Sequence, residues 1–356
     1  MKAAEIVVIG TGSIARGVVY GLSHVPGIPL RVAILGRSHA KAAEIALLAN
    51  ARSASVGTRI VCQPIRISQL KDVEFSRIFL SVKPKIILIA ASLQSPWEMT
   101  QEENAWTRLV AQGGFSVTLP LQLTLAAEVC RAAAGLQAAV VNACYPDCVN
   151  VVLRRLDLRT TCGLGNAAII EAFCRSHDGK RDRKKDVRVL AHHGHLGPWL
   201  SRKAAGKQPR IWIKGHEVQP QKVRPDLHLR EIGEELNSVT TSTAIPLLLS
   251  LLSGETLRTS IPGVDGLPGG YPFLLKRGKF FLQLPSGVTR SEAIAHNKKG
   301  ERLDGLDLGE GVKFIGKART ALDAAKFAYA QGFAFSEWPL ACERMVSLRD
   351  RLRGTR

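Results

Sequence analysis

The stretch AEIVVIGTGSIARGVVYGL, residues 4–22, constrains the fold more than any other part of the sequence. The apolar run from Ile6 to Ile9 is typical of a strand that is covered on both faces. Gly10 and Gly12 permit a tight turn, so that backbone N–H groups at the start of the following helix can approach a phosphate. Ala15 takes the place of the third glycine of a GxGxxG pattern and still allows the helix to pack closely on the strand. This order predicts a nucleotide-binding domain.

The alternation of strand and helix continues through the first half of the chain. Apolar runs within 30–38, 83–97 and 136–153 predict further buried strands, and KAAEIALLANA at 41–51 predicts a helix. Strands that alternate with helices form a parallel sheet with right-handed connections. The fold class expected for this half is therefore α/β, with a Rossmann-type parallel sheet.

The chain is long enough for two domains. It has 356 residues, of which 46% are hydrophobic and 22% are charged, a balance typical of a globular protein with a sizeable core. The composition shifts near residue 150. We therefore expect a nucleotide-binding Rossmann domain in residues 1–150 and an α+β substrate domain in residues 151–356.

The end of the second predicted strand indicates which nucleotide binds. An NAD enzyme usually has an acidic residue there to hold the ribose 2′-hydroxyl, whereas this chain has Gly36, Arg37 and Ser38. Arg37 can pair with a 2′-phosphate and Ser38 can donate to it, and such a charge-assisted contact contributes roughly 1.5–3 kcal/mol. We expect NADP(H) rather than NAD(H); the alternative is an exposed arginine on an ordinary loop. The expected cofactor-binding residues are Gly10, Gly12, Ser13, Ile14, Arg37, Ser38 and Ala91.

The formal net charge of +19 is the unusual bulk property of the sequence. It peaks in GKRDRKKDVR (179–188) and RDRLRGTR (349–356), which favours an anionic partner or substrate or, alternatively, a solvated loop and tail. No nucleic-acid motif accompanies these residues. Met1 leads directly into a strand pattern without a signal-peptide succession, and the longest apolar runs are too short to span a bilayer. The seven cysteines have no disulfide-scaffold spacing, so we expect a cytoplasmic protein away from membranes.

The order of several segments resembles that of the lactate/malate dehydrogenase family. After the N-terminal GxGxxA, the segments that carry the resemblance are AASLQSPW (90–97), CYPDC (144–148), CGLGNAAIIEAF (162–173), HHGH (192–195), SVTTSTAIPLLLSLL (238–252), GGYPFLLKRGKFFLQLPSGV (269–288) and DLGEGVKFIGKARTALDAAK (307–326). The resemblance implies a Rossmann domain followed by that family's C-terminal domain, with 307–326 as the long final helix. It also implies a homodimer or homotetramer.

The resemblance also implies a role for His193. The family's catalytic histidine precedes a glycine in this loop, and here that pair is His193 and Gly194. A positioned imidazole can pass a proton to or from a carbonyl oxygen because its pKa lies near neutrality. We expect His192 and His195 to be polar residues of an irregular loop. A metal site is the weaker alternative, since the three histidines have no helical i, i+4 pair and no nearby carboxylate.

Other features of the family's site are missing from this sequence. The positions that would supply an orienting Asp and a clamping Arg after residue 162 hold neither, and 91–106 has no arginine. A small 2-oxo acid therefore loses its bidentate anchor, which argues against lactate or malate. Glu171 could orient His193 or hold a cationic substrate, or be an exposed helix residue. Tyr145, which replaces the family's Asn, could donate its hydroxyl to a developing alkoxide, or simply pack against the turn.

Thr241 matches a family threonine near the substrate, so we predict that it lines the substrate site. Trp97 and Trp199 could form large apolar walls for a bulkier, less charged substrate, or be core residues. Cys148 near His193 could act as a nucleophile, although a buried thiol that packs beside the sheet is the commoner outcome.

These features lead to two hypotheses of function. The first is an NADP(H)-dependent oxidoreductase in which His193 is the acid or base, and which transfers hydride to or from a C=O or C=N carbon. Its substrate would be a small molecule, or one held on a peptide or carrier protein as in specialised metabolism. The second is a catalytically degenerate NADP-binding sensor or scaffold, because loss of the Asp and of every clamp Arg is what such decay would produce.

Overall fold

The computed structural model describes residues 2–98, 103–177, 186–201, 208–225 and 233–354. Its first half contains a six-stranded parallel sheet in the order β3-β2-β1-β4-β5-β6, in which Ile6 of β1 lies between Val32 and Ile86. This is the strand order of a Rossmann fold, and it confirms the predicted fold class. The strands are β1 (Ile6–Ile9), β2 (Leu30–Gly36), β3 (Ile60–Arg66), β4 (Ile86–Ile89), β5 (Ala139–Asn142) and β6 (Cys162–Gly163).

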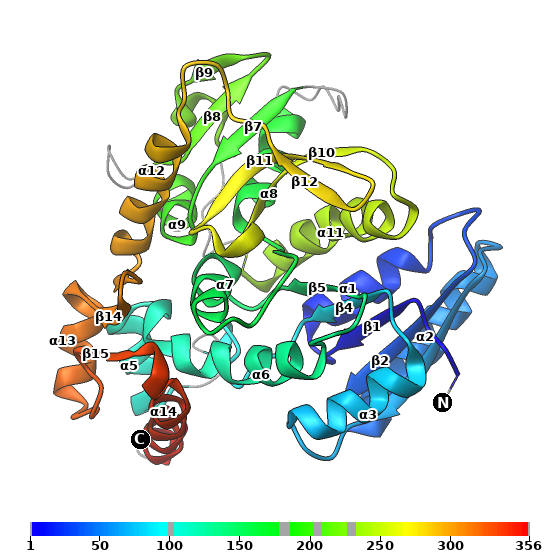
Figure 1. Cartoon of the computed structure of the whole chain (residues 1–356), viewed down its shortest axis with the longest axis horizontal. Coiled ribbons are helices and arrows are strands. Elements are labelled where there is room, and N and C mark those ends of the chain that lie inside the picture. The colour runs from blue at the N-terminus through cyan, green and yellow to red at the C-terminus, as the bar shows by residue number, and fades with distance from the viewer. Residues whose placement is uncertain (1, 99–102, 178–185, 202–207, 226–232, 355–356) are drawn as a thin grey trace.

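Helices cover both faces of this sheet (Figure 1). Side chains of β1 alternate between them: Ile6 and Val8 pack into the core with α1 and α2, whereas Val7 and Ile9 pack into the core with α3, α6 and α7. Burial on both faces explains the continuous apolar run of β1 in the sequence. The helices of this part are α1 (Ser13–Leu22), α2 (His39–Ser55), α3 (Asp72–Val82), α5 (Ala105–Gly113), α6 (Leu119–Ala132) and α7 (Pro146–Arg155).

The second part of the chain combines helices with two small antiparallel sheets, β7-β8-β9 and β10-β11-β12, which a bridge between Ala191 and Gly270 joins. The segment 269–288, which carries part of the family resemblance, contains the hairpin of β11 and β12. The elements are α8 (Asn166–Ser176), β7 (Val187–Leu190), α9 (His193–Leu200), β8 (Arg210–Ile213), β9 (His216–Val218), α11 (Leu236–Ser253), β10 (Leu257–Pro262), β11 (Gly270–Lys276), β12 (Lys279–Leu282) and α12 (Arg290–Leu303). Short 3-10 turns are η1 (Phe115–Thr118), η3 (Pro220–Val223), η4 (Gly233–Glu235), η5 (Val264–Gly266) and η6 (Phe335–Glu337).

Helix α11 packs along α1 and ties this part to the sheet. Gly17 and Gly21 of α1 make the contact possible, because a Cβ atom on Gly17 would lie 2.6 Å from Thr241 Cγ2 and one on Gly21 would lie 2.9 Å from Ile245 Cδ1. Within the described residues, α11 is the one helix long and apolar enough to cross a membrane by length and composition. Its packing on α1 and α8 makes it a helix of the protein fold.

The last part of the chain returns to the first domain. The sheet of β13 (Leu306–Asp307), β14 (Gly311–Phe314) and β15 (Gly332–Ala334) is followed by the final helix, and α13 (Gly316–Ala324) and α14 (Trp338–Arg353) pack against α5 and α6 (Figure 1). The expected long helix over 307–326 is therefore wrong: this segment holds β14 and the short α13. The predicted boundary at residue 150 falls inside α7, and β6 follows it in the same sheet.

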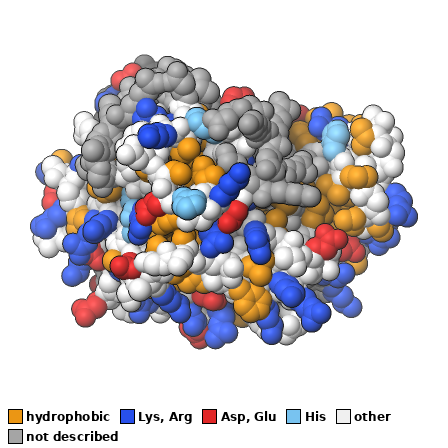
Figure 2. Space-filling view, turned by 90° about the horizontal axis from the view of Figure 1, so that it is seen from above, with side chains coloured by type: hydrophobic (Ala, Val, Ile, Leu, Met, Phe, Trp, Pro, Cys, Tyr) orange, Lys and Arg blue, Asp and Glu red, His pale blue; other side chains and the backbone are white. Residues whose placement is uncertain are grey.

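The basic side chains do not gather into one block on the face shown in Figure 2. Lys and Arg side chains lie there among acidic and uncharged ones. Of the two basic stretches noted in the sequence, residues 179–185 and 355–356 lie outside the described residues.

Candidate active site

The glycine turn between β1 and α1 opens into a cavity of about 600 Å³ at the carboxyl ends of the parallel strands. Gly10 has φ +130°, and a Cβ atom there would lie 2.5 Å from the carbonyl oxygen of Ala90 on β4's continuation, so only glycine fits. Gly12 is the N-cap of α1 and provides no side-chain cap, and no acidic residue lies in the first turn. The N–H groups at this end of α1 are therefore suited to an anionic ligand.

Most of the predicted cofactor-binding residues line this cavity: Gly10, Gly12, Ser13, Ile14, Arg37 and Ala91. Ser38 is not among them. Its hydroxyl is the N-cap of α2 and accepts a hydrogen bond from Lys41 N at 3.3 Å. Serine at this position satisfies a backbone donor that the helix leaves open, and the predicted cofactor contact of Ser38 stays a prediction.

His193 lies at the first position of α9, rather than in an irregular loop, and faces the same cavity. Its backbone N–H donates to Asp147 Oδ1 at 3.0 Å, and its Nδ1 lies 2.7 Å from Asp304 Oδ2. The carboxylate accepts from Nδ1–H, which leaves Nε2 as the ring atom available to a ligand. Burial lowers the pKa of His193, but the charge and hydrogen bond of Asp304 outweigh burial, so the pKa is raised.

Asp304, whose side chain is 11% exposed, is the centre of this cluster. It follows α12 as its C-cap, and its Oδ2 accepts hydrogen bonds from both His193 Nδ1 and the Tyr145 hydroxyl. Burial raises the pKa of the Asp304 carboxyl, yet the neighbouring His193 and the two hydrogen bonds hold it at about 2. The pair therefore consists of an ionised carboxylate and an imidazole whose protonated form it stabilises.

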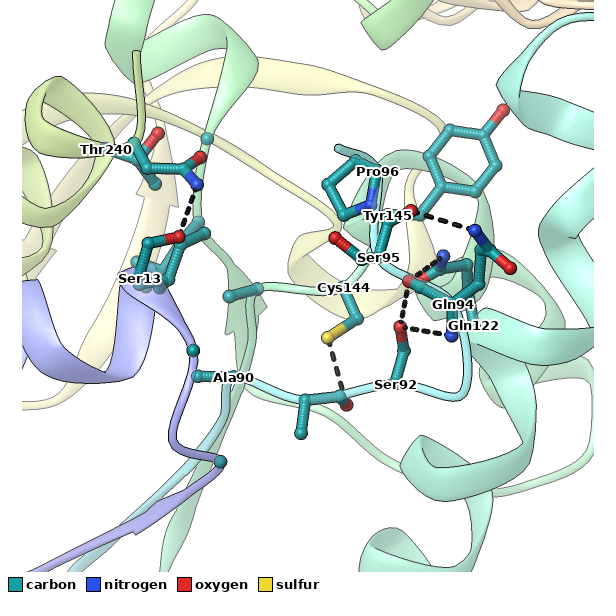
Figure 3. A pocket seen from close by; sticks show the side chains of 18 of the residues that line it. Ser13, Ala90, Ser92, Gln94, Ser95, Pro96, Gln122, Cys144, Tyr145 and Thr240 are labelled. Carbon is teal, nitrogen blue, oxygen red and sulfur yellow. Dashed lines mark hydrogen bonds between the residues drawn. The ribbon is translucent and has the colours of Figure 1, made fainter. Parts of the chain in front are cut away.

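Tyr145 lines the cavity at the turn between β5 and α7 (Figure 3). Its ring stands edge-on to those of His193 and Phe115, with centroids 5.0 and 5.2 Å away. The hydroxyl donates to Asp304, so it is not free to donate to a substrate alkoxide as predicted. Pro146, which follows Tyr145, occupies the first position of α7.

One wall of the cavity is the segment from Ser92 to Trp97, whose polar groups are satisfied by the protein (Figure 3). The Gln94 backbone carbonyl accepts from Ser92 Oγ at 2.6 Å and from Gln122 Nε2 at 3.0 Å. The buried Gln94 side chain accepts from Trp106 Nε1 at 2.9 Å. This wall therefore has a defined conformation without a ligand.

The C-terminal helix holds the same wall from outside the cavity. Gln94 Nε2 donates to Glu98 at 2.7 Å, and Glu98 accepts two hydrogen bonds from Arg353 of α14, at 2.8 and 2.6 Å. Arg349, one turn earlier, donates to the carbonyl oxygen of Leu93 at 2.6 Å. No local pattern in the sequence indicates this connection.

Two residues predicted for the site lie elsewhere. Glu171 is buried and accepts from Arg175 at 2.7 and 2.9 Å and from Ser260 N, so it is neither the partner of His193 nor exposed. Burial raises its pKa, and Arg175 opposes this. Trp199 is fully buried in a core cluster, with its Nε1 donating to the carbonyl of Pro220 at 2.9 Å.

The other predicted substrate residues divide between cavity and packing. Trp97 lines the cavity as expected. Thr241 does not: it packs on Gly17, and its neighbour Thr240 lines the cavity instead. Thr240 and Thr241 differ in this way because they lie on helix α11, where consecutive side chains point in different directions.

His192, His195 and Cys148 are buried close to His193. His192 Nδ1 caps α9 by accepting from Gly194 N at 3.1 Å, and its Nε2 lies 3.5 Å from Cys148 Sγ. His195 stacks on His296, with ring centroids 4.6 Å apart. Both His192 and His195 are buried, so their prediction as polar loop residues was wrong. Burial raises the pKa of Cys148 well above its ordinary value, and this thiol is not an accessible nucleophile.

Charged groups are sparse around the cavity. Among the described residues that line it, Arg37 is the only Lys or Arg, and Glu234 is the only Asp or Glu. Helix α8 presents Asn166 and Ile169 there, in agreement with the missing Asp and Arg of the sequence. No group of three or more His, Cys, Asp or Glu side chains among the described residues is placed to hold a metal ion.

Comparison with known proteins identifies the fold. No protein-family model and no curated protein matches this sequence. Among solved structures, malate dehydrogenase from Archaeoglobus fulgidus in complex with NADH is similar, with a TM-score of 0.55, 12% identity and coverage of 85% of this chain and 97% of that one. Lactate dehydrogenase from Cryptosporidium parvum, complexed with lactic acid and nicotinamide adenine dinucleotide, gives a TM-score of 0.52, 12% identity and coverage of 85% and 98%. The chain therefore has the lactate/malate dehydrogenase-like fold.

Proposed function

We propose that this chain is an NADP(H)-dependent oxidoreductase that exchanges hydride with the C=O or C=N carbon of a substrate other than a small 2-oxo acid. The observation that carries the proposal is the hydrogen-bonded pair of His193 and Asp304 on the cavity that also receives the glycine turn. An acid/base and a phosphate-binding turn on one cavity are what hydride transfer with proton exchange requires.

The residues of the turn fit a dinucleotide. Gly10 leaves no room for a side chain between β1 and β4, and the uncapped start of α1 offers N–H donors to a pyrophosphate. Arg37 at the end of β2 is the one Lys or Arg among the described residues on the cavity and would pair with a 2′-phosphate. The similar dehydrogenases were solved with NAD and NADH, so the preference for NADP(H) rests on Arg37 and on the absence of an acidic residue beside it.

His193 would give or take the proton. Its Nδ1 is engaged by Asp304, so the exchangeable proton is the one on Nε2, and Asp304 stabilises the imidazolium without being protonated itself. A bound nicotinamide would supply or accept the hydride. The raised pKa of His193 favours the imidazolium, the form that donates the proton which reduction of a carbonyl or imine consumes.

The cavity favours an uncharged reacting group. Beside His193 lie the rings of Phe115 and Tyr145, and the wall opposite contributes Trp97 and uncharged polar groups. Without a guanidinium near His193, a carboxylate next to the reacting carbon would be buried without its partner, which costs several kcal/mol. A substrate held on a peptide or carrier protein agrees with this cavity and with the basic sequence.

The first test is a calorimetric titration of the purified protein with NADPH and separately with NADH. We expect NADPH to bind more tightly, and Arg37→Ala to weaken NADPH binding tenfold or more, about 1.4 kcal/mol, without changing NADH binding. The matched control is Arg31→Ala, which removes an exposed arginine at the other end of β2. Absence of binding by both nucleotides would refute the proposal.

The second test follows NADPH oxidation with a panel of aldehydes, ketones and imines. His193→Ala is expected to abolish turnover while the affinity for NADPH is retained. If NADPH binds but neither free nor peptide-bound carbonyls are turned over, the alternative of a catalytically degenerate NADP-binding sensor or scaffold is favoured. A cytoplasmic location and a homo-oligomeric state stay predictions of the sequence.

A further inference from the structure

The backbone at Tyr145 is in an unusual conformation for its residue type. Its φ of 49° and ψ of 50° lie in the left-handed region, which costs a non-glycine residue roughly 1–2 kcal/mol. Six other non-glycine residues in the described chain have positive φ, and all of them are exposed polar side chains: Lys83, Asp157, Lys214, Asp265, Arg277 and Lys326. Tyr145 is the one that is aromatic and buried. Backbone strain of this kind persists only where the surrounding contacts fix the residue, and such residues cluster at functional sites.

The backbone conformation of Tyr145 places its hydroxyl against Asp304 Oδ2. The ring is wedged edge-on against His193 and Phe115, with interplanar angles of 78° and 76°. From there the hydroxyl donates to Asp304 Oδ2, the same oxygen that accepts from His193 Nδ1. Two donors of very different acidity therefore share one carboxylate oxygen.

We propose that Tyr145 is a positioning residue that sets the acidity of His193 through Asp304. The proposal rests on the proposed role of His193 as the acid or base. A carboxylate oxygen that already accepts from a phenol carries less negative charge toward a second donor, so it stabilises an imidazolium less than it would alone. Tyr145 thereby keeps the proton on His193 transferable, while its hydrogen bond also fixes the orientation of the carboxylate.

Few charged groups lie near enough to His193 to change its proton affinity. From α7, Asp147 accepts the backbone N–H of His193, and Cys148 contacts the neighbouring His192. Asp304, the C-cap of α12, bonds the imidazole ring, whereas Glu301 of α12 acts electrostatically on Cys148. Among these acidic groups, Asp304 is the one that bonds the imidazole ring, and its bond with Tyr145 is the one that a phenylalanine would remove.

The experiment measures the imidazole titration of His193 directly, in full-length protein carrying ¹³C-labelled histidine. The His193→Gln variant assigns its resonance among the nine histidines. We expect Tyr145→Phe to raise the proton affinity of His193 by about threefold or more, because Asp304 then has one donor fewer. The matched control is Tyr271→Phe, which removes a buried hydroxyl that bonds the carbonyl of Pro268 and leaves Asp304 untouched. An unchanged or lowered affinity in Tyr145→Phe overturns the proposal.

A graded substitution protects the test against a folding defect. Replacing Tyr145 by 3-fluorotyrosine keeps the ring and the hydrogen bond but makes the phenol a stronger donor. The proton affinity of His193 should then follow the order phenylalanine, tyrosine, fluorotyrosine, from high to low, and any other order of tyrosine and fluorotyrosine contradicts the proposal. The titration needs no substrate or cofactor, so its result is independent of whether NADPH binds. Once a substrate is known, the pH profile of kcat should shift in the same order.

Discussion

Arg353, in the last turn of the C-terminal helix, donates two hydrogen bonds to Glu98 at 2.8 and 2.6 Å, although the two residues lie 255 positions apart. Glu98 in turn accepts from Gln94, whose backbone forms part of the cavity wall. The end of the chain is thereby a structural element of the candidate active site. This connection makes the cavity wall sensitive to changes in α14.

The first prediction concerns this connection. Arg353→Ala leaves the buried Glu98 carboxylate without its guanidinium donors, which costs roughly 1–3 kcal/mol of local stability. We expect hydrogen exchange of the amides of residues 92–98 to accelerate about tenfold or more. The double variant Glu98→Arg/Arg353→Glu should restore part of the protection, whereas Arg344→Ala, an exposed arginine on the same helix, should change nothing. Equal exchange in Arg353→Ala and wild type would show that the wall is held without α14.

The second prediction concerns Asp304. In Asp304→Asn the imidazolium of His193 loses its ionised partner, so burial dominates and the pKa of His193 falls below its ordinary value. Reduction of a carbonyl substrate at neutral pH should drop about 100-fold or more, because general acid catalysis is lost, while the affinity for NADPH is retained. Turnover that survives this substitution at neutral pH would mean that His193 needs no carboxylate partner.

The third prediction separates Glu171 from the site. Glu171→Ala removes the partner of Arg175 and the acceptor of Ser260 N–H in the core, and we expect a loss of roughly 3 kcal/mol in the free energy of unfolding. Glu171→Gln keeps an acceptor for Ser260 and should lose less. Denaturant titrations measure both losses, and calorimetry should find NADPH binding unchanged in the folded variants. A weakened affinity for NADPH at full stability would contradict the structural role.

The fourth prediction is a loss of stability in mild acid that comes from His195 and His296. Burial, together with neighbouring positive groups, lowers the pKa of His195 to about 2 and that of His296 to about 4. Both pKa values lie below the unfolded value of about 6.5, so the unfolded chain binds protons that the folded chain does not, and stability falls as the pH drops from about 6.5 toward 4. Each histidine contributes a slope of up to about 1.4 kcal/mol per pH unit.

Denaturant unfolding at several pH values between 4 and 7 checks this dependence. His193 contributes with the opposite sign, because its raised pKa makes the folded chain bind this proton at a higher pH than the unfolded chain does, and its contribution is complete once the pH lies well below the unfolded value of about 6.5. His296→Gln should flatten the slope, whereas His216→Gln, at an exposed histidine, should leave it as it is. A slope that is the same in His296→Gln and wild type would assign the acid sensitivity to other groups.

Local patterns in the sequence were sufficient for the Rossmann part of the fold. The run from Ile6 to Ile9, the turn at Gly10 and the small Ala15 each record a local requirement: burial on both faces, a backbone with positive φ, and close helix packing. Helix α11 and the hairpin of β11 and β12 lie within segments that carry the family resemblance. The same resemblance implied one long helix over 307–326, and this was wrong, because the segment forms β14 and the short α13.

The family resemblance pointed to His193, which the structure places on the cavity, and the sequence itself lacks the arginine clamp. Only the tertiary structure decided which carboxylate serves His193. Glu171 is nearer to His193 in the sequence, but its carboxylate accepts hydrogen bonds from Arg175 and Ser260. Asp304 lies 111 residues beyond His193, at the end of α12, and bonds the imidazole instead. A side-chain hydrogen bond requires the donor and acceptor atoms to lie about 3 Å apart. The packing of α12 on α9 brings Asp304 and His193 to this distance, and no periodic pattern in the sequence predicts that packing. The same holds for Arg353 and Glu98, whose contact exists only because α14 folds back on the first domain.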